Sequence, residues 1–306
     1  MVPLIEKLDY PFSHADALFA DQIEAMAQTW IDWLDLPGEF AYKYKKSRLA
    51  NLATRFFPHA SLPVLEAAGL HLVLFFAFDD LYANKNLLQL QVHSNQAIEN
   101  LQGHHLKHVP NVIRAFTALR EKLLELTNDQ WLQRFILNVQ RYFDAMLAEA
   151  FISSSGIYPS IRYYTIIREN LVGLYQLVDF LEPERDFVFP TEIVTSPYFC
   201  RLRKSAVLIM SWLNDIVSYP KEYRDGEIFN LVLVTAREKG YAIDEAMERA
   251  INLHNREIEH FIRICNNPPD FGEYNREVNR YISDLQFMIT GHKVWSELTY
   301  RYNSPI

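Results

Sequence analysis

The stretch AVLIMSWLNDIVSYPKE, residues 206–222, decides the fold class of this chain. Its first half, Ala206–Leu213, is apolar nearly all round, which predicts a buried helix. Asn214, Ser218 and Glu222 follow at four-residue spacing, so a continuing helix places their oxygen-bearing side chains on one face. We therefore expect a buried helix that emerges at a cavity. The alternative is a polar stripe on a surface helix.

Apolar residues recur at three- and four-residue spacing through most of the chain, which is typical of amphipathic helices. The predicted helices cover residues 17–36, 62–81, 109–126, 130–153, 161–181, 199–218, 228–239, 243–265 and 271–300. Only 9 glycines occur in 306 residues, which leaves little room for tight hairpins. The sequence contains no Gly/Ser-rich linker and no repeat. We predict an all-α protein with a single helical domain over residues 1–306.

Composition excludes several classes of function. A net charge of −8 without a basic tract argues against binding nucleic acid. Cys200 and Cys265 are the only cysteines, which argues against a disulfide framework and favours a reducing compartment. The N-terminus has no signal-peptide pattern, and the longest apolar tract, residues 67–78, is too short to span a bilayer. We expect a soluble, cytoplasmic protein without a membrane span.

A second cluster of polar groups ends the apolar stretch LPVLEAAGLHLVLFFAFDDLYAN, residues 62–84. Asp79 and Asp80 fall near the C-terminal end of its predicted helix, where the helix dipole disfavours an exposed carboxylate by roughly 0.3–1 kcal/mol. A bound cation would reverse that sign, whereas the alternative is a solvated helix end. Carboxylate, amide and hydroxyl oxygens suit Mg²⁺, so this pair and the Asn-Ser-Glu series are candidate metal ligands.

These two motifs resemble those of the bacterial class I terpene synthases. The nine residues from Asn214 to Glu222 resemble the family's second metal motif in full, and Asp79-Asp80 resembles its aspartate-rich motif. Arg168, 46 residues before Asn214, matches the arginine that senses diphosphate in the family. Arg301-Tyr302, preceded by Trp295, matches the C-terminal Arg-Tyr pair. The resemblance implies a helical bundle around a central apolar cavity.

The first motif departs from the family pattern. Family members usually close it with a further acidic residue, where this chain has Ala83 and Asn84. We therefore expect Asp79 to coordinate metal and Asp80 to pair with a basic side chain such as Arg301, and Asn84 to matter little.

The resemblance also implies a substrate, a cofactor and a role for each matched residue. The substrate is a linear isoprenoid diphosphate, with the C15 farnesyl chain favoured and the C20 geranylgeranyl chain close behind, and the product is a terpene hydrocarbon or alcohol. Three Mg²⁺ ions assist loss of diphosphate, which leaves an allylic cation to cyclise. Dimers are frequent in the family, so a homodimer is an open expectation. The implied metal ligands are Asp79, Asp80, Asn214, Ser218 and Glu222; the implied diphosphate-binding residues are Arg168, Lys221, Arg301 and Tyr302; Phe76 and Trp295 are the aromatic candidates for stabilising the cation, and Gly173 marks the helix break whose carbonyl faces the reacting end of the substrate.

Two other functions stay open at this point. A prenyl-elongating transferase shares the fold, but usually has two aspartate-rich motifs. A degenerate helical protein that binds isoprenoids or partners without turnover would explain the missing acidic residue at Ala83 and Asn84. One further motif, Glu182-Pro183-Glu184-Arg185-Asp186, is predicted to be a solvated loop.

Overall fold

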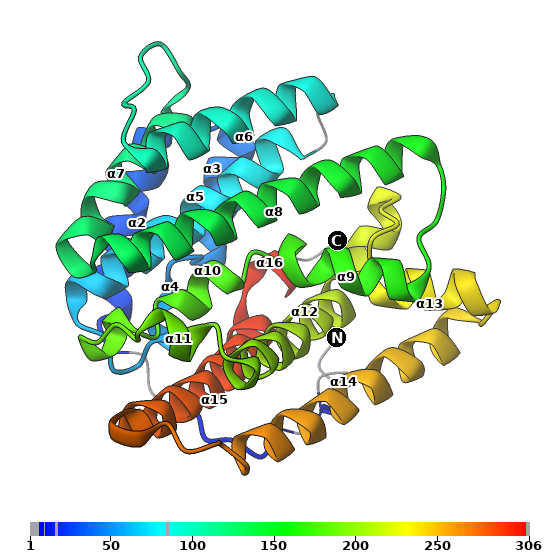
Figure 1. Cartoon of the computed structure of the whole chain (residues 1–306). Coiled ribbons are helices and arrows are strands. Elements are labelled where there is room, and N and C mark those ends of the chain that lie inside the picture. Colours follow the sequence, from blue (N-terminus) through cyan, green and yellow to red (C-terminus); the bar gives the residue numbers. More distant parts are fainter. Residues whose placement is uncertain (1–5, 9, 16–17, 84–85, 304–306) are drawn as a thin grey trace.

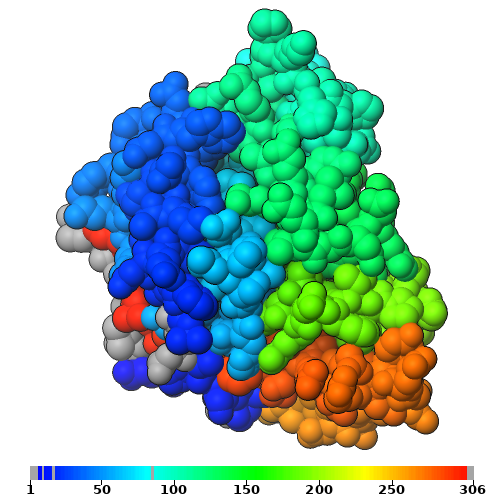
Figure 2. All heavy atoms as spheres, turned by 90° about the vertical axis from the view of Figure 1, so that its left-hand side faces the viewer, coloured from blue at the N-terminus to red at the C-terminus, as the bar shows by residue number. Residues whose placement is uncertain are grey.

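The computed structural model describes residues 6–8, 10–15, 18–83 and 86–303. For residues 302 and 303 it describes the backbone but not the side chains. These residues contain helices and no strand, as the hydrophobic periodicity predicts. Figure 1 shows the long α8 crossing the middle of the molecule, with α6 and α7 on one side of it and α12, α14 and α15 on the other. Figure 2, turned by 90°, shows the N-terminal helices beside the α7–α8 region and the α14–α15 connection beneath them.

The helices follow one another with short connections. The N-terminal half contains α2 (Ala20–Leu34), α3 (Gly38–Ser47), α4 (Asn51–Phe56), α5 (Leu62–Tyr82), α6 (Leu87–Gln102), α7 (Asn111–Leu126) and α8 (Asp129–Ser155). The C-terminal half contains α9 (Ile161–Leu171), α10 (Tyr175–Asp179), η1 (Pro183–Arg185), α11 (Thr191–Val194), α12 (Pro197–Asp225), α13 (Leu231–Lys239), α14 (Ile243–Cys265), η2 (Gly272–Tyr274), α15 (Asn275–Leu298) and α16 (Tyr300–Asn303).

The helix that carries the Asn-Ser-Glu series, α12, has clear start and stop signals. The Ser196 hydroxyl accepts a hydrogen bond from the Phe199 amide at 3.3 Å, and Pro197 occupies the first turn, where its missing N–H costs nothing. The helix passes through Pro220 and ends at Gly226, whose φ of 75° suits a residue without a Cβ. Most of its residues before position 219 are buried, as the apolar first half predicts.

The predicted helices are largely confirmed, with one wrong and several missed, among them the four-residue helices α11 and α16. The segment 161–181 is not one helix, because α9 ends at Leu171 and Gly173 takes a φ of 69° before α10 starts. The helices α3, α4 and α6 were not predicted, since α4 has only six residues and the polar residues of α6 interrupt its apolar spacing.

The acidic run after α10 is a correction to the sequence analysis. Glu182 and Glu184 are 2% and 5% exposed, so the run is not a solvated loop. The Arg134 guanidinium donates to both Glu182 carboxylate oxygens at 2.6 and 2.7 Å, and Glu184 accepts the His59 amide at 2.9 Å. Charged groups are buried here because each has a partner from a distant helix or loop.

One continuous cluster of buried apolar residues runs from Leu8 to Trp295. Its largest fully buried members include Trp131, Tyr44 and Tyr164. Among the described helices, α5 alone has the length and hydropathy needed to cross a membrane, and 72% of its most apolar window is buried inside the protein. The apolar character of α5 is thus explained by core packing. The single domain over residues 1–306 stays a prediction.

Candidate active site

Asp80 lies at the C-terminal end of α5 and gathers three donors around one oxygen. The Tyr44 hydroxyl lies 2.6 Å from Asp80 Oδ2, Lys43 Nζ lies at 3.5 Å and Arg301 Nη1 at 3.6 Å. The expected pairing of Asp80 with the C-terminal arginine is therefore present. Burial alone would raise the pKa of Asp80, but Arg301, Lys43 and the Tyr44 hydrogen bond outweigh burial and lower it.

The two aromatic candidates differ in their surroundings. The Arg301 guanidinium covers one face of Phe76, with its carbon 4.5 Å from the ring centroid, a cation–π contact. That face of Phe76 is therefore occupied by the protein's own cation. Trp295 is 3% exposed and lies one turn before the end of α15.

Arg168 joins α9 to the start of the second motif. Its Nη2 donates to Asn214 Oδ1 at 2.6 Å and its Nε to Asp215 Oδ1 at 2.9 Å. The other Asp215 oxygen accepts the Tyr164 hydroxyl and the Leu231 amide, the latter at 2.7 Å. Burial opposes a charge on Arg168, but the Asp215 carboxylate outweighs it and raises the pKa of the guanidinium. Arg168 is thus fixed, fully charged, beside the Asn-Ser-Glu series.

The other polar side chains of the second motif, those of Ser218, Lys221 and Glu222, are also held by hydrogen bonds or ion pairs. The Ser218 hydroxyl donates to the Asn214 carbonyl at 2.7 Å, which leaves the oxygen lone pairs of Ser218 available. The Asn230 amide donates to Glu222 Oε2 and to the Asp215 carbonyl, both at 2.8 Å. Lys221 pairs with Asp225 at 2.8 Å and lies 3.7 Å from Glu227.

A group of carboxylates spans the space between α5, α8 and α12. Burial, with a contribution from Asp80, raises the pKa of Asp79 to about 6. Burial and the charge of Asp79 raise the pKa of Glu149 to about 8, and burial and the charge of Glu222 raise that of Glu227 to about 7. These side chains repel one another in the absence of a cation.

Several of these residues were missed in the sequence analysis. Glu149, Lys43 and Tyr44 belong to no recognised motif, and only the packing of α3 and α8 against α5 brings them to the site. Glu227 follows the second motif in a stretch, Arg224 to Glu227, that also resembles the family, but it was not predicted as a site residue. Asn230 carried a signal, because an asparagine before an apolar run predicts a helix N-cap, and it does accept the Val232 amide at 2.9 Å.

The donor chemistry fits a hard divalent cation. Among the residues that the structure describes, no three His, Cys, Asp or Glu side chains are close enough together to hold a metal ion. Nevertheless, Glu149 is within electrostatic range of both Asp79 and Glu222, and the raised pKa values of Asp79 and Glu149 show that nearby positive charge would favour their ionised forms. Asn214, Ser218 and Glu222 each retain oxygen lone pairs beyond their present hydrogen bonds, so they fit Mg²⁺.

Gly173 separates α9 from α10, five residues after Arg168. A Cβ there would meet only the Tyr142 ring at 3.5 Å, an ordinary contact, so the positive φ of 69° is what requires glycine. The helix break that the resemblance implies is present. Two predicted positions cannot be placed: the side chain of Tyr302 and the whole of Asn84 lie outside the described residues.

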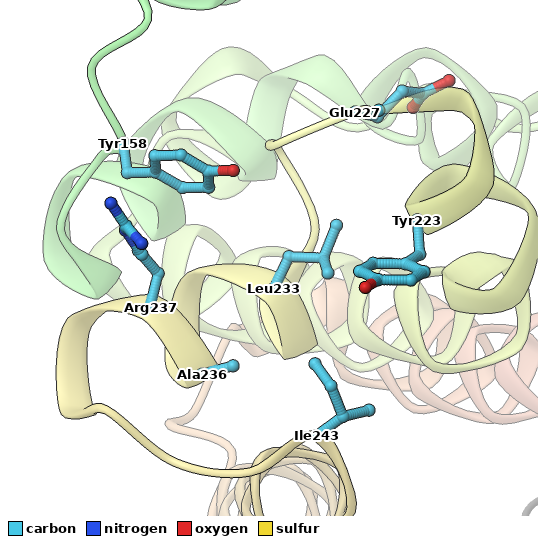
Figure 3. Close-up of a pocket in the computed structure, with 8 residues that line it drawn as sticks. Tyr158, Tyr223, Glu227, Leu233, Ala236, Arg237 and Ile243 are labelled. Carbon is cyan, nitrogen blue, oxygen red and sulfur yellow. The ribbon is translucent and has the colours of Figure 1, made fainter.

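A pocket of about 290 Å³ lies beside the α12–α13 connection (Figure 3). Its apolar part includes Leu233 and Ile243, and the Arg237 guanidinium lies 5.0 Å from the centroid of the Tyr158 ring. Figure 3 shows the Glu227 side chain directed away from this apolar lining. None of the site residues predicted from the sequence lines the pocket, and Glu227 is the one member of the carboxylate group that borders it.

Taken together, an all-helical bundle, a carboxylate pair at the end of α5 and an Asn-Ser-Glu series on α12 beside a buried arginine define the class I terpenoid synthase fold. A family model for terpene synthase family 2, C-terminal metal binding, matches residues 71–260. The chain belongs to this family and is a terpene synthase.

Relatives cover nearly the whole chain. The (+)-T-muurolol synthase of Roseiflexus castenholzii, described as cyclising (2E,6E)-farnesyl diphosphate, is 29% identical over 303 residues, which cover 97% of this chain and 93% of that enzyme. The germacrene A synthase of Nostoc punctiforme is 27% identical over 302 residues, covering 96% and 94%. Among solved structures, a variant of cucumene synthase has a TM-score of 0.84 at 24% identity, covering 95% of this chain and 100% of that one. At that identity the structural match supports the fold alone.

Proposed function

We propose that this terpene synthase is a Mg²⁺-dependent cyclase of farnesyl diphosphate. The observation that carries the proposal is the placement of Asp79 and the Asn-Ser-Glu series around Arg168, a cation fixed by Asp215 and directed at the site. The C15 chain is favoured over the C20 chain because the muurolol synthase relative is described as acting on farnesyl diphosphate.

The charges of the site suit a metal-bound diphosphate. If bound metal ionises all seven carboxylates of the site, they exceed its four cations by three negative charges. Three Mg²⁺ ions bring six positive charges and a substrate diphosphate about three negative ones, so the loaded site is close to neutral. The carboxylates are Asp79, Asp80, Glu149, Asp215, Glu222, Asp225 and Glu227, and the cations are Lys43, Arg168, Lys221 and Arg301.

Each group has a part in the reaction. Asp79, Asn214, Ser218 and Glu222 would hold the ions, which supply Lewis-acid stabilisation of the charge that develops on the leaving diphosphate. Arg168 stabilises the same charge from a fixed position, because Asp215 and Asn214 hold its guanidinium before substrate arrives. The apolar side chains of α5 and α15 would exclude water from the cation, and the face of the Phe76 ring opposite Arg301 would stabilise it by about 2 kcal/mol in a desolvated site.

The test is product analysis with C10, C15 and C20 diphosphates, with Mg²⁺ and with a chelator. We expect volatile sesquiterpenes from the C15 substrate, and none when the metal is removed. A longer prenyl diphosphate would indicate an elongating transferase, and no release of diphosphate from any substrate would indicate a protein that only binds isoprenoids.

Glu222→Gln should reduce turnover at least 100-fold without changing the helical circular dichroism signal, since a neutral amide is a poor ligand for Mg²⁺. Glu259→Gln, at an exposed position on α14, is the matched control and should keep full activity. An unchanged rate in Glu222→Gln would remove this residue as a ligand.

A further inference from the structure

Two cations share one carboxylate oxygen at the edge of the site. Lys43 Nζ and Arg301 Nη1 lie 3.5 and 3.6 Å from Asp80 Oδ2, and the same oxygen accepts the Tyr44 hydroxyl. One carboxylate balances one positive charge, so this group carries a surplus of positive charge. Lys43 is also within electrostatic range of Lys221, whose own partners are Asp225 and Glu227. Two cations that share the single carboxylate of Asp80 are suited to an anion.

The position of Lys43 is set by its neighbour in the chain. Tyr44 is fully buried, and its hydroxyl lies 2.8 Å from the Phe76 carbonyl oxygen as well as 2.6 Å from Asp80. These contacts fix α3 on the last turns of α5. The Lys43 side chain is 27% exposed, so it is accessible to a ligand while its backbone is held. A preorganised lysine loses less conformational freedom when it binds an anion.

The other lysines of α3 point elsewhere. Lys45 pairs with Asp32 at 2.5 Å, and Lys46 lies 5.7 Å from the centroid of the Tyr42 ring. Only Lys43 of the three reaches the end of α5. The helix α3 therefore presents one lysine, Lys43, to the site. Lys46 of the same helix provides a control, because its substitution removes the same charge away from the site.

We propose that Lys43 binds the diphosphate group of the substrate and the inorganic diphosphate that its ionisation releases, alongside Arg301 and Lys221. The inference rests on the proposed function, because it places the diphosphate beside Asp79 and Asp80. It adds to the site a residue from α3, well outside both metal motifs. The ligand is a diphosphate in complex with Mg²⁺, and its recognition by a lysine needs charge and reach rather than a fixed bidentate geometry.

The first test measures binding of inorganic diphosphate in the presence of Mg²⁺ by isothermal titration calorimetry, without turnover. Lys43→Met should weaken binding about 10-fold, Lys43→Arg should stay within about 2-fold of the unsubstituted protein, and Lys46→Met should have no effect. Circular dichroism checks that each variant is folded. Equal affinity of Lys43→Met and the unsubstituted protein would overturn the inference.

A second test separates binding of the anion from support of Asp80. If Lys43 acts only through Asp80, Lys43→Met will have no further effect in an Asp80→Asn background. If Lys43 contacts the diphosphate, the double variant will bind about 10-fold more weakly than Asp80→Asn alone. An absence of Mg²⁺-diphosphate binding by the unsubstituted protein would overturn the proposed function and the role of Lys43 together, whereas normal product formation with equal binding by Lys43→Met would overturn the role of Lys43 alone.

Discussion

Replacing Gly291 with alanine tests how closely α15 approaches α4. A Cβ on Gly291 would lie 2.2 Å from the Arg55 carbonyl oxygen and 2.8 Å from the Arg55 carbonyl carbon. Ordinary contact begins at 3.4 Å, so the helices would have to separate by about 1.2 Å (3.4 minus 2.2). These neighbours are backbone atoms, and no change of rotamer relieves the clash.

The magnitude follows from two opposing terms. Overpacking costs about 1–3 kcal/mol, and the upper end applies because the obstacle is backbone. Alanine returns up to about 1 kcal/mol through its better helix propensity. The net loss is about 2 kcal/mol, which corresponds to a decrease in Tm of about 3 °C for a chain of this size.

Two other glycines provide a graded comparison in the same assay, thermal unfolding followed by far-UV circular dichroism. A Cβ on Gly69 would meet Ile23 Cγ2 at 3.2 Å and Trp30 Cζ3 at 3.3 Å, side-chain atoms that can shift, so Gly69→Ala should cost less than about 1 kcal/mol. Nothing lies within 4 Å of a Cβ on Gly38, so Gly38→Ala should leave Tm unchanged or slightly raised. A Tm for Gly291→Ala equal to that of Gly38→Ala would refute the reasoning.

Three further predictions concern the site and the core. Glu149→Gln should raise the Mg²⁺ concentration needed for half-maximal activity several-fold, because it removes negative charge that lies within electrostatic range of Asp79 and would attract the ions. An unchanged metal requirement would place Glu149 outside the ion site. Asn230→Ala should also raise the metal requirement, since Glu222 loses the donor that holds it, and Mn²⁺ binding followed by electron paramagnetic resonance should weaken in parallel. Burial lowers the pKa of His71 to about 3 from 6.5, so its neutral ring stabilises the fold fully above pH 6.5, and about 1.4 kcal/mol is lost for each pH unit below that value until the folded pKa is reached. Urea unfolding at pH 7 and pH 5 should show a smaller acid loss in His71→Phe than in the unsubstituted protein, and equal losses would contradict this.

Sequence periodicity predicted the long helices because their burial depends on a local pattern. The apolar residues of α5 and the first half of α12 determine that each is buried, whatever its partner. The acidic run at Glu182 was misjudged because its partner, Arg134, lies 48 residues earlier, and no local pattern records such a contact.

Within the site, too, residues in a local sequence pattern could be predicted, whereas residues brought in by tertiary contacts could not. Asp79, Asn214, Ser218 and Glu222 could be predicted as metal ligands because each belongs to a motif with fixed spacing. Glu149 was missed because it is one of many charged residues on α8, and only packing against α5 brings it near Asp79. Side chains that act through tertiary proximity alone leave no mark in a single sequence.

The cluster around Asp80 has a consequence for the order of folding. Its cations come from positions 43 and 301, more than 250 residues apart, and closing so long a loop is slow until the intervening helices have packed. In a partly collapsed chain the adjacent carboxylates of Asp79 and Asp80 repel each other without their basic neighbours. We therefore expect the Asp80 cluster to form among the last events of folding, so that a partly folded chain lacks a complete site.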